Sequence, residues 1–169
     1  MRKVVAPVLA AVLIAIAAAC GPVEGAPGSV GHPAPDYQAP SATGETVSLE
    51  ELRGEVVLLN IWATWCPPCR IEMPHLQALH EELAGQGLRV VGVSVDSRGS
   101  ERAVDRFTEE LGVEFLILRD PGERVAHVFG AYGVPFNVLI DRDGVIRWRH
   151  SGPVTAEDPG LRAALDGAL

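Results

Sequence analysis

Apolar positions along the chain fall into two kinds of segment: continuous runs and runs spaced like one face of a helix. Two continuous runs, residues 55–62 and 88–95, are typical of strands buried on both faces of a parallel sheet. Between them, apolar residues recur every three or four positions, which predicts a helix over about 67–84 that is kinked at Pro74. The apolar residues of this helix are Met73, Leu76, Leu79 and Leu83.

Shorter elements are expected on either side of these three. A helix should run from Ser100, as its cap, to about Leu111, and should turn Ala103 and Phe107 inward together with Leu111. The other expected elements are an extended or hairpin segment at 34–54 with a strand at 46–49, a strand at 115–118, a brief helix at 125–129, strands at 136–140 and 145–148 around an Asp-Gly turn, and a last helix at 159–168. This order, βαβα and then ββα, predicts an α/β sandwich with helices on both faces of a sheet.

The first twenty residues form a segment of their own. Arg2 and Lys3 precede an apolar run that ends in small residues, which is the pattern of a secretory signal peptide. The run is shorter than the roughly 20 apolar residues that a membrane span needs. It ends at Cys20 in a sequence that resembles a bacterial lipobox, although Ala17 stands where that box usually has leucine. We therefore expect a lipid on Cys20, with ordinary cleavage or an uncleaved anchor as alternatives, and a folded part outside the cytoplasm.

The remaining residues divide into a tether and one domain. Residues 21–33 are rich in Gly, Pro and Ala and are expected to form a flexible tether. Residues 34–169 then make one domain of ordinary size, and 47% hydrophobic residues in the whole chain suffice for a core.

The charge balance excludes several classes of function. The chain has 14 basic and 22 acidic residues; without residues 1–20, which hold two basic and no acidic ones, the net charge is −10. Such a chain is a poor ligand for nucleic acid. Lys3 is the only lysine, so the mature chain can offer neither a P-loop lysine nor a Schiff base. The glycines show no nucleotide-binding order, and we expect no cofactor.

Two cysteines stand where the first buried strand should turn into the following helix. A cysteine at a helix N-terminus meets the positive end of the helix dipole, so Cys66 should be an exposed thiol that ionises readily. Cys69, one turn later, should be more buried. A pair this close stabilises a fold little, so we interpret it as a redox pair. Cys66 would attack a substrate disulfide, and Cys69 would resolve the mixed disulfide.

The residues between the cysteines bear on the direction of the reaction. Pro67 and Pro68 have no N–H, so two possible hydrogen bonds to a thiolate are missing. No histidine stands between the cysteines to stabilise the thiolate. We therefore expect a reducing or intermediate couple rather than a donor of disulfides.

Three further positions are candidates for the same site. Glu72 follows Cys69 by three residues on the same helical face, so it is either a proton acceptor for that thiol or an exposed carboxylate. Trp65 is expected at the surface beside the cysteines, and Trp62 in the core. Pro135, if cis, would present the Val134 backbone to an extended substrate; a plain trans proline is the alternative.

Several motifs together resemble one family. They are Val47-Ser48-Leu49, Leu52-Arg53-Gly54, the run from Asn60 through Trp65-Cys66-Pro67-Pro68-Cys69 to Arg70, Glu72-Met73-Pro74, Tyr132-Gly133-Val134-Pro135, Leu139 to Gly144, and Ile146 to Gly152. From about residue 32 onward the chain resembles the extracytoplasmic thioredoxin-like family that includes TlpA, ResA and CcmG (DsbE). The resemblance implies a thioredoxin-like fold, a catalytic Cys66–Cys69 pair that forms a redox disulfide, a functional acid at Glu72 and a cis Pro135.

The resemblance also implies partners. These would be protein substrates with disulfides, typically the haem-binding cysteines of apocytochrome c, and a membrane electron donor of the DsbD or CcdA type. Asn60 stands where cytoplasmic thioredoxins have a buried aspartate, which agrees with the exported branch. Phe136 stands where CcmG usually has glutamate, so a more general envelope disulfide reductase or isomerase stays open.

Three other functions are alternatives. A peroxiredoxin needs threonine three residues before its reactive cysteine, where this chain has Ala63. A zinc site could use the two cysteines with His75 and His80, but on a helix these ligands would diverge, so no metal is expected. A copper chaperone is possible because paired thiols bind Cu(I), although no Met-rich or His-rich tract supports it.

Overall fold

A five-stranded mixed sheet forms the centre of the protein. The computed structural model describes residues 28–169. The strands lie in the order β5–β4–β3–β6–β7. Their bounds are β3 Val56–Trp62, β4 Leu88–Ser94, β5 Leu116–Arg119, β6 Phe136–Ile140 and β7 Ile146–Ser151. β3 is parallel to β4, and β4 to β5, whereas β6 pairs antiparallel with both β3 and β7. Every residue of β3 is buried, as its continuous apolar run predicts.

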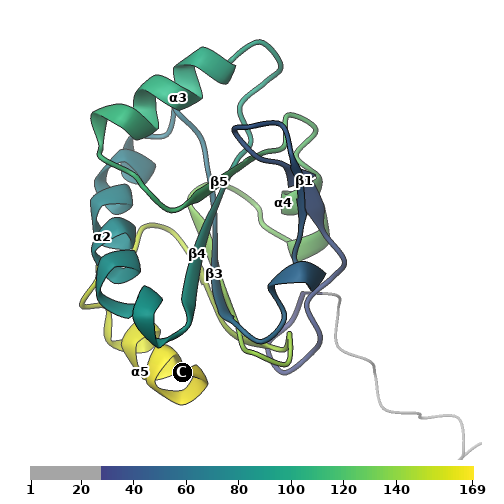
Figure 1. The fold of residues 1–169 in the computed structure, drawn as a ribbon, viewed down its shortest axis with the longest axis vertical. Coiled ribbons are helices and arrows are strands. Elements are labelled where there is room, and N and C mark those ends of the chain that lie inside the picture. Colours follow the sequence, from purple (N-terminus) through teal and green to yellow (C-terminus); the bar gives the residue numbers. More distant parts are fainter. Residues whose placement is uncertain (1–27) are drawn as a thin grey trace, which may run out of the picture.

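Helices cover both faces of this sheet, as the order of elements predicts. Figure 1 shows α2, α3 and α5 on one face, and α4 with the strand β1 on the other. The helices are α2 Pro67–Leu83, α3 Glu101–Glu110, α4 Arg124–Phe129 and α5 Pro159–Ala168. The N-terminal hairpin consists of β1 Gln38–Pro40 and β2 Thr46–Ser48, and two short 3-10 helices are η1 Glu50–Leu52 and η2 Ala84–Gln86. This arrangement confirms the predicted α/β sandwich of the thioredoxin-like type.

Aromatic side chains connect the sheet to the helices on the α2 face. Trp62 at the end of β3 is fully buried, as predicted, and stacks on Phe107 of α3 with 4.9 Å between ring centroids. The guanidinium of Arg70, on α2, lies 4.5 Å from the centroid of the same Phe107 ring. The first turn of α2 is thereby fixed against α3 next to the end of β3.

Two details of α3 differ from the sequence-based expectation. Val104, rather than Ala103, is buried beside Phe107, and Leu111 is only partly buried. Val104 has a larger apolar side chain than Ala103, and it takes the position that faces the core. Ser100 precedes the helix but makes no side-chain capping bond, because its backbone (φ −92°, ψ 6°) is not extended as a capping residue requires.

The folded part begins earlier than predicted. The amide of Gly31 donates to the carbonyl of Ile146 at 2.8 Å, and the amide of Ile146 donates to the carbonyl of His32 at 2.9 Å. Residues 31–33, expected within the tether, therefore pair with the start of β7. The signal segment, the remaining tether and Cys20 lie outside the described residues. Within residues 28–169, no helix combines the length and the apolar character that a membrane crossing requires.

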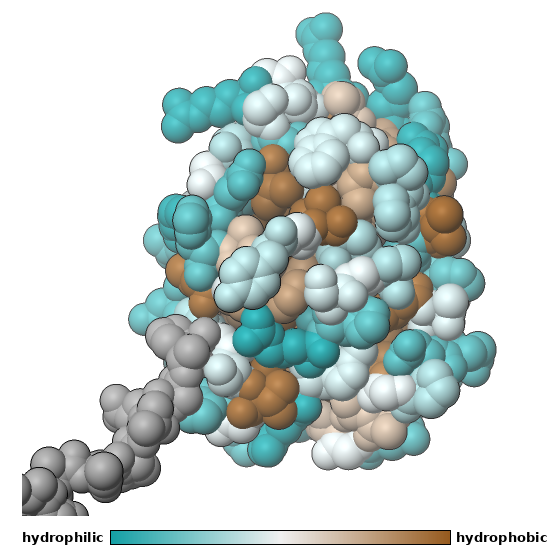
Figure 2. Space-filling model, turned by 180° about the vertical axis from the view of Figure 1, so that it is seen from behind, coloured by the Kyte–Doolittle hydropathy of each residue, from teal (hydrophilic) through white to brown (hydrophobic). Residues whose placement is uncertain are grey.

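Apolar side chains reach the surface in small separate groups. On the side opposite the view of Figure 1, brown side chains form small separate patches among teal polar ones (Figure 2). The large apolar side chains exposed among the described residues are Val30, Trp65, Ile71 and Tyr132. Trp65 and Ile71 flank the first turn of α2, so two of these four side chains lie at that end of the helix.

Candidate active site at the start of helix α2

Cys66 and Cys69 form a disulfide at the point where the loop after β3 enters α2. Their Cα atoms are 5.3 Å apart, and Pro67 and Pro68 occupy the first two helical positions. Proline fits there because the first N–H groups of a helix have no intrahelical acceptor. The two prolines in the sequence therefore explain why α2 begins directly after Cys66.

One hydrogen bond at this turn was not predicted. The amide of Cys69 donates to the Cys66 sulfur at 3.2 Å, so Cys66 is itself the cap of the helix. The two prolines remove other possible donors, but this amide remains and would favour a thiolate on Cys66 after reduction.

The disulfide is more enclosed than predicted. Cys69 is fully buried, in agreement with its expected place, but Cys66 is only 3% exposed. The prediction of an exposed first sulfur is wrong for this oxidised form, because both cysteines pack into the hydrophobic core cluster beneath the start of α2.

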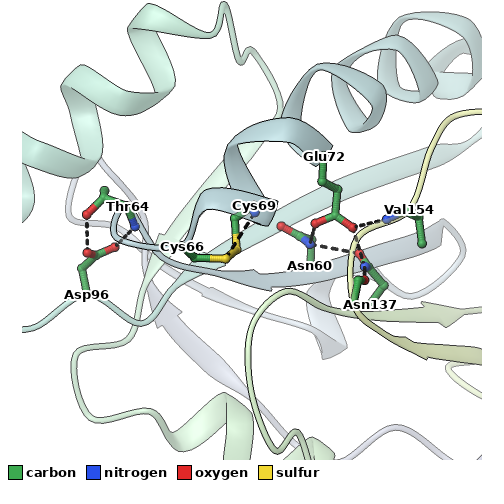
Figure 3. The surroundings of a disulfide bond; sticks show 9 residues. Asn60, Thr64, Cys66, Cys69, Glu72, Asp96, Asn137 and Val154 are labelled. Carbon is green, nitrogen blue, oxygen red and sulfur yellow. Dashed lines mark hydrogen bonds between the residues drawn. A yellow bond between two sulfur atoms is a disulfide. The ribbon is translucent and has the colours of Figure 1, made fainter.

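Glu72 is buried on the inner side of α2, so the alternative of an exposed carboxylate is wrong. Its Oε1 accepts hydrogen bonds from Asn137 Nδ2 at 2.7 Å and from the Val154 amide at 2.9 Å. Its Oε2 accepts one from Asn60 Nδ2 at 2.9 Å. Figure 3 shows this group beside the disulfide. Burial raises the pKa of Glu72 to about 7, although the three hydrogen bonds oppose the rise. The carboxyl group can therefore take up or release a proton near neutral pH.

Two asparagines that contact Glu72 come from neighbouring strands. Asn60 in β3 lies directly opposite Asn137 in β6, and Asn60 Nδ2 also donates to Asn137 Oδ1 at 3.0 Å. Sequence reasoning noted Asn60 only by resemblance and missed Asn137 and Val154. The available signal was a single asparagine in each of two otherwise apolar strands, because a buried amide needs polar partners.

A second hydrogen-bonded group fixes the loop before Cys66. Asp96, just after β4, accepts hydrogen bonds from the Thr64 amide at 3.0 Å, the Thr64 hydroxyl at 2.6 Å and the Ser94 hydroxyl at 2.8 Å. Thr64 lies two residues before Cys66, so Asp96 holds the chain that leads into the helix (Figure 3). No sequence motif had pointed to this group.

Replacing Asp96 by alanine should destabilise the protein by about 2 to 3 kcal/mol, because the Thr64 amide and hydroxyl would lose their buried acceptor. Chemical denaturation of the oxidised protein measures this change. Asp96→Asn keeps one acceptor oxygen and should cost clearly less. Equal costs for the two variants would show that the loop does not depend on these bonds.

The remaining candidates lie near the same end of the sheet, where β3 ends and leads to Cys66. Trp65 is 66% exposed, as predicted. The Val134–Pro135 peptide bond is cis, as the resemblance implies. Phe136, the next residue, pairs with Ile61 near the end of β3. Pro135 therefore lies close to the point where the chain leaves β3 toward Cys66. Within residues 28–169, neither the amide nor the carbonyl group of Val134 has a hydrogen-bond partner.

The structure does not assemble the zinc ligands considered above. His80 is partly buried, and its ring lies edge-on to that of Phe115 with 6.3 Å between ring centroids. Among the residues that the structure describes, no three His, Cys, Asp or Glu side chains are grouped as metal ligands would be.

Known proteins resemble this chain over most of its length. A protein-family model described as the AhpC/TSA family matches residues 30–149. The thiol-disulfide oxidoreductase ResA of Halalkalibacterium halodurans is 35% identical over 127 residues, which are 75% of this chain and 71% of that protein. The thioredoxin-like protein YneN of Bacillus subtilis is 36% identical over 137 residues, 80% and 79% of the two chains.

Among solved structures, a Chlorobium tepidum protein described as the thiol:disulfide interchange protein DsbE has the same fold. Its TM-score is 0.76 at 31% sequence identity, and the match covers 83% of this chain and 97% of that one. Sequence and structure comparisons therefore point to the same group of proteins.

Proposed function

The chain belongs to the TlpA/ResA/CcmG family of thioredoxin-like thiol-disulfide oxidoreductases, and from this premise we propose that it reduces protein disulfides outside the cytoplasmic membrane. The pair that reacts would be Cys66 and Cys69. The observation that carries the proposal is their position at the N-terminus of α2, next to a buried carboxyl group with a pKa of about 7. This geometry provides a nucleophile, a resolving thiol and a proton acceptor in one place.

Cys66 begins the reaction from the reduced state. Its thiolate, favoured by the Cys69 amide and the helix N-terminus, attacks one sulfur of the substrate disulfide. The substrate disulfide breaks, a mixed disulfide forms with Cys66, and the released substrate thiolate takes up a proton.

Cys69 completes the reaction. Its thiol loses a proton, which Glu72 can accept because the pKa of Glu72 lies near neutral pH. The Cys69 sulfur then attacks Cys66, and the second substrate thiol leaves. Two electrons have passed to the substrate, and the protein is left with the disulfide that the structure contains.

The surface around the pair suits an extended polypeptide. Trp65 offers an exposed ring beside the cysteines, and Pro67 and Pro68 form the outer side of the turn. The unpaired backbone groups of Val134, before Pro135, can form strand-like hydrogen bonds with a bound segment. The substrate would be a disulfide-containing protein, with apocytochrome c as one candidate and other envelope proteins as the alternative.

The N-terminus supports the expected location. A signal-like segment that ends at Cys20 would leave the domain tethered outside the membrane by a lipid. Regeneration of the dithiol then needs electrons from a membrane protein of the DsbD or CcdA type.

The reduction potential of the Cys66–Cys69 couple tests the proposed direction. We expect a value near or below about −270 mV, that of thioredoxin, when the full-length chain is equilibrated in defined thiol buffers. A Cys20→Ser control ensures that only the active pair is measured. A value near about −120 mV, that of a strong oxidant, would contradict reduction. Lack of any reversible couple would instead favour the copper-binding alternative.

A further inference from the structure

The side chain of Asn60 has one polar atom without a partner. Asn60 is fully buried in β3, and its Oδ1 is a buried acceptor that receives no hydrogen bond from the described residues. An unpaired buried polar atom costs about 1 to 3 kcal/mol, so native proteins seldom keep one without a use.

The orientation of the amide is fixed by its other contacts. Asn60 Nδ2 lies 2.9 Å from Glu72 Oε2 and 3.0 Å from Asn137 Oδ1. Asn137 Oδ1 must face Asn60, because the Nδ2 of Asn137 donates to Glu72 Oε1 and to the carbonyl of Gly152. Both partners of Asn60 Nδ2 are therefore acceptors, and turning the amide over would set oxygen against oxygen.

Asn60 Oδ1 therefore points away from Glu72 Oε2 and Asn137 Oδ1. Figure 3 shows the Asn60 side chain between Glu72 and the disulfide, with its oxygen on the side of Cys69. In the disulfide, the sulfur of Cys69 has no hydrogen and cannot donate. Reduction puts a hydrogen on that sulfur and creates a donor in a fully buried place.

We propose that Asn60 is a positioning residue for the resolving thiol, whose S–H group donates to Asn60 Oδ1 once the disulfide is reduced. The inference rests on the proposed function of the Cys66–Cys69 pair and extends it. A hydrogen bond to the neutral thiol disfavours its ionisation. Cys69 is thus kept protonated until the mixed disulfide has formed, while Cys66 remains the nucleophile.

The same amide connects Cys69 with Glu72. The chain of bonds runs from the Cys69 S–H to Asn60 Oδ1, and from Asn60 Nδ2 to Glu72 Oε2. This chain places a single side chain, Asn60, between the buried thiol and Glu72.

The S–H stretching band in the infrared spectrum tests this bond directly. In the full-length chain with Cys20→Ser and Cys66→Ala, Cys69 is the only thiol, and its band should lie at the lower frequency of a hydrogen-bonded thiol. Asn60→Leu in this background should move the band to the frequency of a free thiol. Asn60→Asp keeps an oxygen at the same place, so its band should stay low, and it serves if the leucine variant does not fold.

Asn137→Leu is the matched control, because it removes another amide that donates to Glu72 but leaves Asn60 Oδ1 in place. Its band should not move. An unchanged band in Asn60→Leu would mean that Cys69 donates to a backbone carbonyl of its own helix or to a buried water, and would overturn the inference. The band is read without any substrate, so this result is independent of whether the protein reduces disulfides.

Discussion

Replacing Cys66 by serine should abolish disulfide reduction, to the background rate of the thiol buffer alone. Cys66 caps α2 and is the sulfur toward which the Cys69 amide is directed, so its replacement removes the thiolate that starts the reaction. Turnover of a disulfide-containing protein, with a thiol reductant regenerating the chain, measures the effect.

Replacing Cys69 by serine should give a different failure. The first attack still occurs, but the mixed disulfide on Cys66 has no resolving thiol, so the protein should accumulate joined to its substrate. The complex is detected by non-reducing electrophoresis and disappears on addition of excess thiol. Trapping with Cys66→Ser rather than Cys69→Ser would reverse the roles assigned to the two cysteines.

The stability of the oxidised protein should fall by about 2 to 3 kcal/mol between pH 5 and pH 8. Burial raises the pKa of Glu72 from 4.5 to about 7 in the folded state. Between these values the folded protein holds a proton that the unfolded chain has released, so stability decreases as the pH rises. The decrease ends above the folded pKa, where both states are ionised. Denaturant unfolding at a series of pH values measures this slope.

The variant Glu72→Gln should remove most of this slope, since glutamine does not titrate. The acidic side chains Glu82, Glu101 and Asp141 have lowered pKa values, so their contributions change below pH 5 and leave the window undisturbed. Glu82→Gln, which removes an exposed partner of Arg162, is therefore the control and should keep the slope. An unchanged slope in Glu72→Gln would show that the buried carboxyl group is ionised across the whole range.

Local patterns predict most of the elements because they depend on neighbouring residues. The apolar run of β3 predicted the strand before the cysteines, and the spacing of Met73, Leu76 and Leu79 predicted the helix after them. The Asp-Gly turn gave the β6–β7 hairpin. The pattern was less exact about which side chain of a helix is buried: in α3 it is Val104 and not Ala103.

The surroundings of the cysteines depend on residues that are far apart in sequence. Glu72 and Asn137 are 65 positions apart, and Glu72 and Val154 are 82 apart. Thr64 and Asp96 are 32 apart and meet only because β3 and β4 lie side by side. No local pattern indicates such contacts, because they follow from the register of the strands and the packing of α2 on the sheet.

The sequence by itself determined the α/β order, the Cys66–Cys69 pair at a strand-to-helix junction and the position of Glu72 one turn later. Only the tertiary structure decided the burial of Glu72, its three donors and the direction of the Asn60 amide. The physical reason is that helix and strand formation are governed by residues a few positions apart. Desolvation and the pairing of buried polar groups, in contrast, depend on which distant segments the fold brings together.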